Sequence, residues 1–248
     1  MGLFVAVHLV AAFLAVGWWL RRRVSRGLHF LVPPPWLRPQ SLRLYSVLER
    51  ARRELFRGSP AVRLTLLMPD EADARQLRPV LRLGWGRAAS RSAARFRPGE
   101  GLAGKAWDLG APWLVARLPQ GANLDRRREL HAELFSLGPD AAARLSEQQL
   151  RAEVLLASAV ADSAGGLRGV LSIDCLDGIL VPDAEHPDTR ALAWYRRLQR
   201  VSVDVGLILE ALGSPCGLIG SATRTVGQSS DRSATIAALR FTPASTSR

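Results

Sequence analysis

The chain has 248 residues, enough for one sizeable hydrophobic core, and its 48% hydrophobic and 23% charged residues are ordinary for a globular protein. Its formal net charge is +12, and almost all of its basic residues are arginines. The two cysteines, Cys175 and Cys216, lie far apart and in no Cys-x-x-Cys pair, which argues against a secreted disulfide framework.

The excess of positive charge is compatible with two kinds of partner, a nucleic acid or an anionic membrane surface. The arginines are scattered along the chain, and no basic run alternates with aromatic residues. The strongest local cluster, residues 21–23 with Arg26, directly follows an apolar segment. A membrane explains this placement better, so we do not expect nucleic-acid binding.

The apolar segment begins at Gly2 and ends at Leu20, and it contains no acidic or basic side chain. A membrane-spanning helix needs about 20 residues, and this stretch just reaches that length. The end of the segment has the residues typical of a cytoplasmic membrane boundary: Trp18, Trp19, Arg21, Arg22 and Arg23. We therefore expect residues 1–23 to be a single-pass transmembrane anchor in a bacterial inner membrane, with the domain that follows in the cytoplasm.

A cleaved signal peptide and a buried core helix both fit this segment less well. A signal peptide needs positive side chains before the apolar run and a small-residue cleavage site after it, and the sequence has neither. A buried core helix would not end an unbroken apolar run with Trp-Trp-Arg-Arg-Arg. Residues 24–40 follow as a juxtamembrane linker, in which Pro33, Pro34 and Pro35 favour a stiff extended spacer; a proline-rich partner motif is the alternative.

Residues 41–68 predict a helix followed by a strand. Apolar residues recur every three or four positions between 41 and 57, and Gly58, Ser59 and Pro60 end the helix. Residues 61–68 then alternate, with apolar side chains on one face and Arg63 and Thr65 on the other. Further strands are expected at 77–85 and 112–118.

A glycine-rich stretch that starts at Phe96 lies between these last two strands. Pro98, Gly99 and Gly101 indicate a tight turn, and residues 102–109 predict a short helix that Gly110 ends. The amino terminus of that helix is suited to holding an anion, but the turn itself explains the glycines at least as well.

The second half of the chain predicts two more strands, at 153–162 and 167–174, joined by a turn at Gly165 and Gly166. Residues 188–212 keep helical spacing of apolar side chains and predict a long final helix. Residues 214–248 are rich in serine, threonine, alanine and glycine, so we expect a disordered tail; a functional tail is the alternative.

Two motifs in this order resemble the signature of GAF domains: FRPGEGLAGKAWDLGAPWLV, which starts at Phe96, and GVLSID, which ends at Asp174. The resemblance implies an α+β domain over residues 41–213, with a GAF-like antiparallel sheet flanked by helices. It implies a pocket roofed by the less regular segment 118–145, in which 126–137 predict a helix. It also implies a homodimer formed through the first and last helices, or a signalling protein partner.

The sequence departs from several branches of the family. The residues typical of cyclic-nucleotide-binding relatives are not recognisable, and no cysteine stands where a bilin would be attached. Only Cys175 lies within the domain, whereas the methionine-sulfoxide reductase branch needs three cysteines. The resemblance therefore names no cofactor for this chain.

Catalysis would require a nucleophile with a base, paired carboxylates or a metal cluster, and the sequence presents no such set. The densest group of metal-ligand types is Asp183, Glu185, His186 and Asp188. We expect Asp188 to cap the final helix and the other side chains to be solvated. We accordingly predict neither an enzyme nor a metal site.

A ligand pocket of this fold would have aromatic walls and a few polar groups, which suits a small organic molecule. The candidate lining residues are Trp85, Phe96, Trp107, Trp113, His131, Ser172 and Asp174. The alternative is that the aromatic residues simply fill the core. The sequence thus predicts a membrane-tethered cytoplasmic sensory domain that binds a small ligand and signals through a partner or dimer; a dimerisation scaffold without a ligand is the alternative.

Overall fold

The computed structural model of the chain describes residues 28–29, 37–70, 72–85, 95–111, 113–119, 121–212 and 236–239. The predicted anchor, residues 1–23, and most of the predicted linker and tail lie outside the described residues. Among the helices that the structure does describe, none has both the length and the apolar character needed to cross a bilayer.

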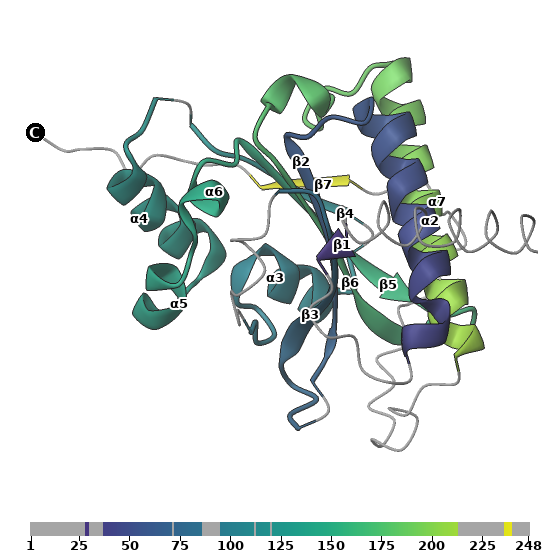
Figure 1. Cartoon of the computed structure of the whole chain (residues 1–248). Coiled ribbons are helices and arrows are strands. Elements are labelled where there is room, and N and C mark those ends of the chain that lie inside the picture. The colour runs from purple at the N-terminus through teal and green to yellow at the C-terminus, as the bar shows by residue number, and fades with distance from the viewer. Residues whose placement is uncertain are drawn as a thin grey trace, which may run out of the picture.

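The centre of the molecule is a single sheet with the strand order β1-β3-β2-β6-β5-β4-β7 (Figure 1). Its strands are β1 Leu28–His29, β2 Val62–Pro69, β3 Leu77–Leu83, β4 Trp113–Arg117, β5 Val154–Ala161, β6 Leu167–Cys175 and β7 Ile236–Leu239. All neighbours are antiparallel except β4 and β7. The five strands from β2 to β6 confirm the strands predicted from alternation and turn residues.

Strand β7 differs from the prediction that residues 214–248 are disordered, because residues 236–239 pair in parallel with β4. The composition of the tail did not indicate this strand, because four residues are too few to change the overall composition of a segment rich in serine and threonine. An edge strand offers unpaired backbone groups to any extended segment that reaches it, and β7 occupies that edge of β4.

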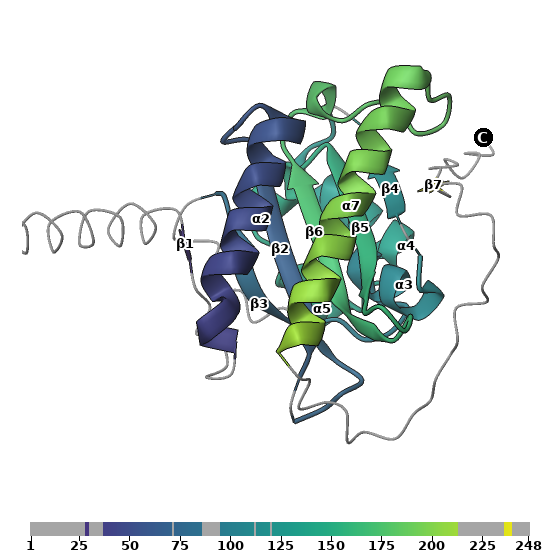
Figure 2. The same ribbon diagram turned by 90° about the vertical axis from the view of Figure 1, so that its right-hand side faces the viewer.

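Two long antiparallel helices, α2 Arg38–Phe56 and α7 Thr189–Ala211, lie side by side on one face of the sheet (Figure 2). They cover the apolar side of β2, including Val62, Leu64 and Leu66, in one continuous core. Helix α7 begins as predicted, because the Asp188 carboxylate accepts a hydrogen bond from the Ala191 amide at 2.6 Å. Its apolar face is therefore aligned on the sheet from its first turn.

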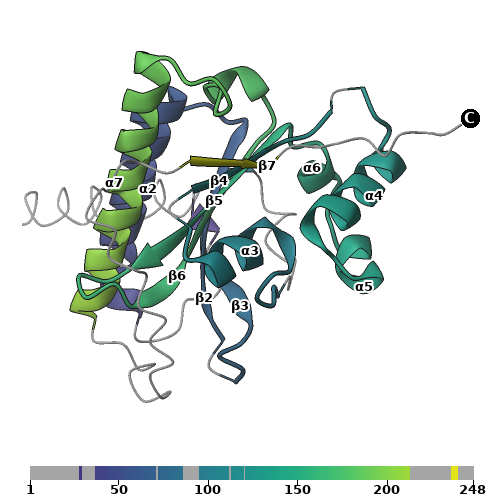
Figure 3. The same cartoon turned by 180° about the vertical axis from the view of Figure 1, so that it is seen from behind.

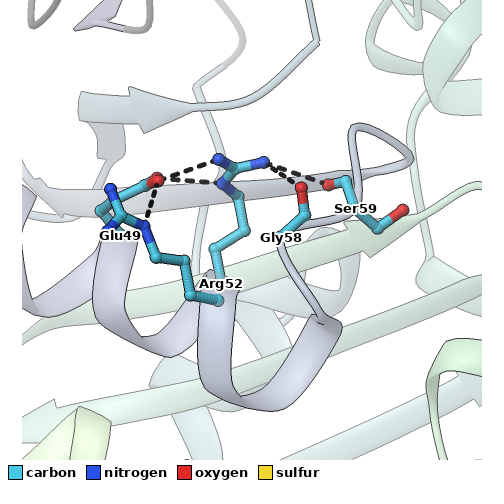
Figure 4. Close-up of polar contacts among 5 residues, drawn as sticks. Glu49, Arg52, Gly58 and Ser59 are labelled. Carbon is cyan, nitrogen blue, oxygen red and sulfur yellow. Dashed lines mark hydrogen bonds and ion pairs between the residues drawn. The ribbon is translucent and has the colours of Figure 1, made fainter.

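Helix α2 starts three residues before its predicted beginning and ends at the Gly58 turn (Figure 4). Arg52 Nε and Nη2 each donate to a carboxylate oxygen of Glu49 at 2.9 Å, and Nη1 donates to the Gly58 carbonyl at 2.7 Å. Arg53 Nε donates to the same carboxylate at 3.0 Å. This network satisfies carbonyl groups beyond the helix end and fixes the direction in which the chain enters β2.

The opposite face of the sheet carries the shorter helices (Figure 3). These are α3 Gly101–Leu109, α4 Leu124–Phe135, α5 Pro139–Ala143 and α6 Glu147–Leu150. The predicted roof, residues 118–145, contained one helix, and its described residues form two, α4 and α5. Helix α6 follows the roof and begins with a capping box between Ser146 and Gln149. Lys105 Nζ donates to the Leu134 carbonyl at 2.6 Å and thereby ties α3 to α4.

The turn before α3 forms as the glycine-rich motif predicts. Gly104 N donates to the Glu100 carbonyl at 3.1 Å, and Gly99 N donates to the Gly104 carbonyl at 3.0 Å. A Cβ at position 104 would lie only 2.1 Å from the Arg97 carbonyl oxygen, so this close approach requires glycine. The α+β architecture, with a mostly antiparallel sheet between two layers of helices, fits a GAF-like fold.

Candidate functional site

A row of polar side chains crosses the sheet face that α3 and α4 cover. Cross-strand pairing places Arg63 opposite Asp174, and Thr65 between Arg82 and Ser172. The five residues come from the three adjacent strands β3, β2 and β6. On an ordinary sheet face such side chains would meet water, but here the short helices cover them, and Arg63, Arg82 and Asp174 are buried.

A cavity of about 70 Å³ lies between this row and the helices above it. The sheet contributes the polar row together with Leu67, Pro79 and Leu155, and the start of α3 contributes Gly101, Leu102 and Ala103. The remaining wall comes from the turn before α3 and from the roof, namely Phe96, His131, Phe135, Leu137, Leu145 and Gln149. A water needs about 10–15 Å³ of such a volume, so several waters or a small organic molecule fit.

Arg63 is held from two sides. Its Nε donates to Asp174 Oδ2 at 2.7 Å, and its Nη2 forms an ion pair with the same oxygen. Its guanidinium carbon lies 4.2 Å from the centroid of the Trp85 ring. The Trp85 indole in turn donates to the Ala61 carbonyl at 3.1 Å, so the whole assembly is fixed at one end of the cavity.

Arg82 contributes a second guanidinium group to the cavity lining, and this residue is only 4% exposed. The pKa of Arg82 is lowered to about 10, chiefly by burial and also by the nearby Arg63, while Asp174 acts in the opposite direction. Arg82 is therefore still a cation at neutral pH. Burying like charges is unfavourable unless other groups compensate, so this pair of arginines is the main electrostatic feature of the site.

His131, on α4, lies in the roof of the cavity and is 4% exposed. Its pKa is lowered to about 4, chiefly by burial, with Asp174 acting in the opposite direction and Arg127 contributing to the lowering. The imidazole is thus neutral at pH 7. Within the part of the chain that the structure describes, its Nε2 is buried and has no hydrogen-bond partner.

Arg127 lies on α4, the helix that carries His131, and does not line the cavity. Its Nη1 donates to the Leu150 carbonyl at 3.0 Å and to the Ala152 carbonyl at 3.3 Å. These bonds join α4 to the segment that leads into β5, and the His131 ring packs edge-on against Phe135 at a centroid distance of 5.3 Å. The roof is therefore held in a defined position above the sheet.

The structure brings together four of the seven predicted pocket residues, Phe96, His131, Ser172 and Asp174. The three tryptophans do not line the cavity. The Arg63 guanidinium lies over the Trp85 ring, and Trp107 is a partly buried residue of α3 that packs against the apolar core between α3 and the sheet.

Trp113 lies on the other face of the sheet, in the core beneath α2 and α7. Successive residues of a strand point to opposite faces, so Leu114 and Ala116, not Trp113, face the cavity side. The prediction placed Trp113 by its aromatic character rather than by its register.

Sequence reasoning missed Arg63, Arg82, Thr65 and Gln149 as lining residues. The signal for two of them was present, because the alternation in residues 61–68 sets Arg63 and Thr65 on the face away from the apolar residues. That face was not recognised as buried, since nothing in the strand itself tells what covers it.

An open groove adjoins the cavity. It runs between the turn before α3 and the α4–α5 connection, and Phe96 and Leu145 line both the groove and the cavity. Arg95, Arg97 and Arg144 also line the groove, together with the acidic Glu100 and Asp140. The two shared apolar side chains thus separate the interior from a polar entrance.

No protein-family model and no curated protein matches the chain. Several of the similar solved structures are GAF domains. The nlh2 GAF domain of A. aeolicus in an inactive state is 17% identical, with a TM-score of 0.40 over 68% of this chain and 97% of that one. A GAF domain/HD domain protein from Geobacter sulfurreducens is 11% identical, with a TM-score of 0.41 over 72% and 98%.

A free methionine-R-sulfoxide reductase from Neisseria meningitidis, solved with its substrate, is 18% identical, with a TM-score of 0.37 over 75% of this chain and 97% of that one. Identities and TM-scores this low carry no argument about what this chain binds or catalyses. The assignment of the fold rests on the strand order and on the placement of the helices.

Proposed function

We propose that this chain is a GAF-type sensory domain that binds a small ligand in the cavity between the sheet and the roof. The supporting observation is the buried polar row of Arg63, Arg82 and Asp174. A chain that needed only a packed core would fill this space with apolar side chains, because each buried charge costs several kcal/mol in desolvation. Retaining three charges around an internal space favours a binding role.

A catalytic role has less support. His131, the histidine at the cavity, is a weak base because burial lowers its pKa to about 4. Asp174 is already occupied by Arg63. Ser172 lines the same cavity, but no hydrogen bond to a base is present among the described residues, so we propose a binding protein and not an enzyme.

We further propose that residues 1–23 tether the domain to the cytoplasmic face of the bacterial inner membrane. The support is the uncharged run from Gly2 to Leu20 with three arginines directly after it. Such a tether would keep α2, which begins at Arg38, close to the bilayer surface.

Binding of a ligand in the cavity would affect the long helices α2 and α7 through the strands that contact both. Strands β2 and β6 contact the cavity with one face, through Thr65 and Ser172, and contact α2 and α7 with the other, through Leu66 and Ile173. A ligand that shifts these strands shifts the helices. The exposed side chains Leu42, Val203 and Leu207 are the places on α2 and α7 where a second copy or a signalling partner would dock.

The test is a thermal-shift screen of the purified full chain against nucleotides, amino acids, organic acids and haem. A ligand that binds the folded state raises Tm by mass action, equivalent to about 2.7 kcal/mol at a concentration of 100 times Kd. The shift should be lost in Ser172→Leu, which fills the cavity, and kept in Arg53→Met, which lies on the other side of the sheet. A stable dimer that no compound stabilises would favour the scaffold instead.

A further inference from the structure

The outer side of the helix pair α2 and α7 carries a group of arginines towards one end. Trp194 Nε1 donates to the Leu55 carbonyl at 3.0 Å, and the Trp194 and Phe56 rings meet edge-on at 5.4 Å, so the end of α2 lies beside the beginning of α7. In Figure 2 no other described element covers this side of the pair. We call the exposed arginines of these two half-helices the basic face: Arg50, Arg53, Arg57, Arg190, Arg196, Arg197 and Arg200.

The charge of the basic face exceeds that of the acids around it. Residues 47–57 contain four arginines and two glutamates, and residues 189–200 contain four arginines and no acid. Glu49 is buried and is paired with Arg52 and Arg53. Apart from Arg53, no arginine of the basic face forms an ion pair within the described part of the chain. The acids of these half-helices and of the loop before α7 are fewer than the arginines: Glu49, Glu54, Asp183, Glu185 and Asp188.

Strand β1 places an early segment of the chain near the same end of α2. Leu28 pairs with Leu83 of β3, and Leu83 pairs with Leu64, near the start of the strand β2 that follows α2 in the chain. Figure 2 shows β1 at the edge of the sheet, beside α2. Residues 21–27 separate the proposed anchor from β1 and span at most about 23 Å when fully extended. The proposed tether would therefore hold this side of the domain within reach of the bilayer surface.

We propose that the basic face binds the anionic phospholipid headgroups of the membrane to which the chain is tethered. This inference rests on the tether in the proposed function and adds the surface by which the domain meets the bilayer. Guanidinium groups bind phosphate through paired hydrogen bonds, and clustered basic side chains are attracted by the negative potential of an anionic leaflet. A leaflet presents many headgroups over a wide area, which suits arginines spread over two neighbouring half-helices.

A lipid surface fits the basic face better than a nucleic acid or a second copy of the chain. The aromatic residues Trp194 and Tyr195 pack against each other and donate to carbonyl groups of the chain itself, so they do not offer stacking surfaces for bases. A second copy would bring the same positive charge, and two basic faces repel each other. The exposed apolar side chains at which a protein would dock lie towards the opposite end of the pair: Leu42, Val203 and Leu207.

The experiment measures how close the basic face lies to a bilayer. The full chain with Cys216→Ser, in which Cys175 is buried, is reconstituted into nanodiscs that carry an acceptor-labelled lipid. A donor dye is attached to Ala193→Cys, among the arginines of α7, or to Ala143→Cys, on α5 across the sheet; both positions are exposed. We expect energy transfer from position 193 to be about two-fold higher in discs with about a third phosphatidylglycerol than in discs of phosphatidylcholine alone. The increase should disappear in about 0.5 M salt, and transfer from position 143 should change little.

Arg197→Gln combined with Arg200→Gln should about halve the increase at position 193. Arg126→Gln combined with Arg151→Gln removes the same charge on the roof side and should leave it unchanged. Equal transfer in the two kinds of disc, no effect of the first variant, or tighter binding of duplex DNA than of phosphatidylglycerol vesicles would overturn the inference.

A failure of the tether is distinguishable from a failure of the basic face. If the chain does not enter the discs, the tether fails, and the basic face is then tested by sedimentation with phosphatidylglycerol vesicles. Sedimentation that the first variant weakens several-fold would support the inference, and no sedimentation would overturn it. The thermal-shift screen for a cavity ligand does not depend on either result.

Discussion

The titration of His131 makes the stability of the domain depend on pH in a way that one substitution removes. Burial lowers the pKa of this imidazole from 6.5 to about 4 in the folded protein. The unfolded chain therefore takes up the proton first as the pH falls. The contribution is fully present above pH 6.5 and is lost progressively until about pH 4, where the folded state is protonated too.

The size of the effect follows from the difference in pKa between the two states. A difference of about 2.5 at about 1.36 kcal/mol per pKa unit corresponds to about 3 kcal/mol of stability lost between pH 7 and pH 4. His131→Phe keeps an aromatic ring beside Phe135 and removes both the titration and the unpaired Nε2. It should therefore be at least as stable as the wild type at pH 7 and should lose about 3 kcal/mol less on acidification.

Urea unfolding of both proteins at a series of pH values, followed by circular dichroism, measures this difference. The carboxylates of the chain also make stability depend on pH in the acid range. Their contribution to the free energy of unfolding is the same in both proteins and cancels in the comparison. His186→Gln replaces an exposed histidine that does not line the cavity and controls for the loss of a histidine in general. Parallel pH profiles for the wild type and His131→Phe would show that the imidazole is not held neutral by burial.

Three further outcomes follow from other parts of the structure. Gly206→Ala should cost about 1–3 kcal/mol in urea unfolding, because its Cβ would lie 2.0 Å from a carbonyl oxygen at the end of β5, whereas Gly138→Ala meets no atom within 4 Å and should be near neutral. Burial raises the pKa of the Cys175 thiol to about 11, so in a variant whose other cysteine is replaced by serine, Cys175 should react with a thiol reagent only after unfolding. Rapid labelling of the native protein would contradict this. Leu207→Arg on α7 should reduce the mass measured by light scattering to that of a monomer, while Leu109→Arg on α3 should not, and equal masses would argue against docking through α7.

Much of the fold was readable from local patterns. The strands from β2 to β6 follow from alternation, from the turns at Gly165 and Gly166, and from the glycine-rich motif before α3. Helix α7 follows from the spacing of its apolar residues and from Asp188 as its cap. These features depend on neighbours in sequence, which is why the sequence alone specifies them.

The site was less predictable because it depends on what covers the sheet. Arg63 in an alternating strand is equally consistent with a solvent-facing side chain and with one beneath a second layer, and only the positions of α3 and α4 decide between them. Arg82 gave no signal for the same reason, and the register of β4 turned Trp113 to the opposite face. The pairing of β7 with β4 joins segments more than a hundred residues apart, which local patterns do not encode.

The central claim, that the cavity binds a small metabolite, is tested most directly by equilibrium dialysis. A bacterial metabolite extract is dialysed against the full chain and against Ser172→Leu, and the retained compounds are identified by mass spectrometry. We expect at least one small compound to be enriched by the wild type and not by the variant. Identical profiles for the two proteins would contradict the claim.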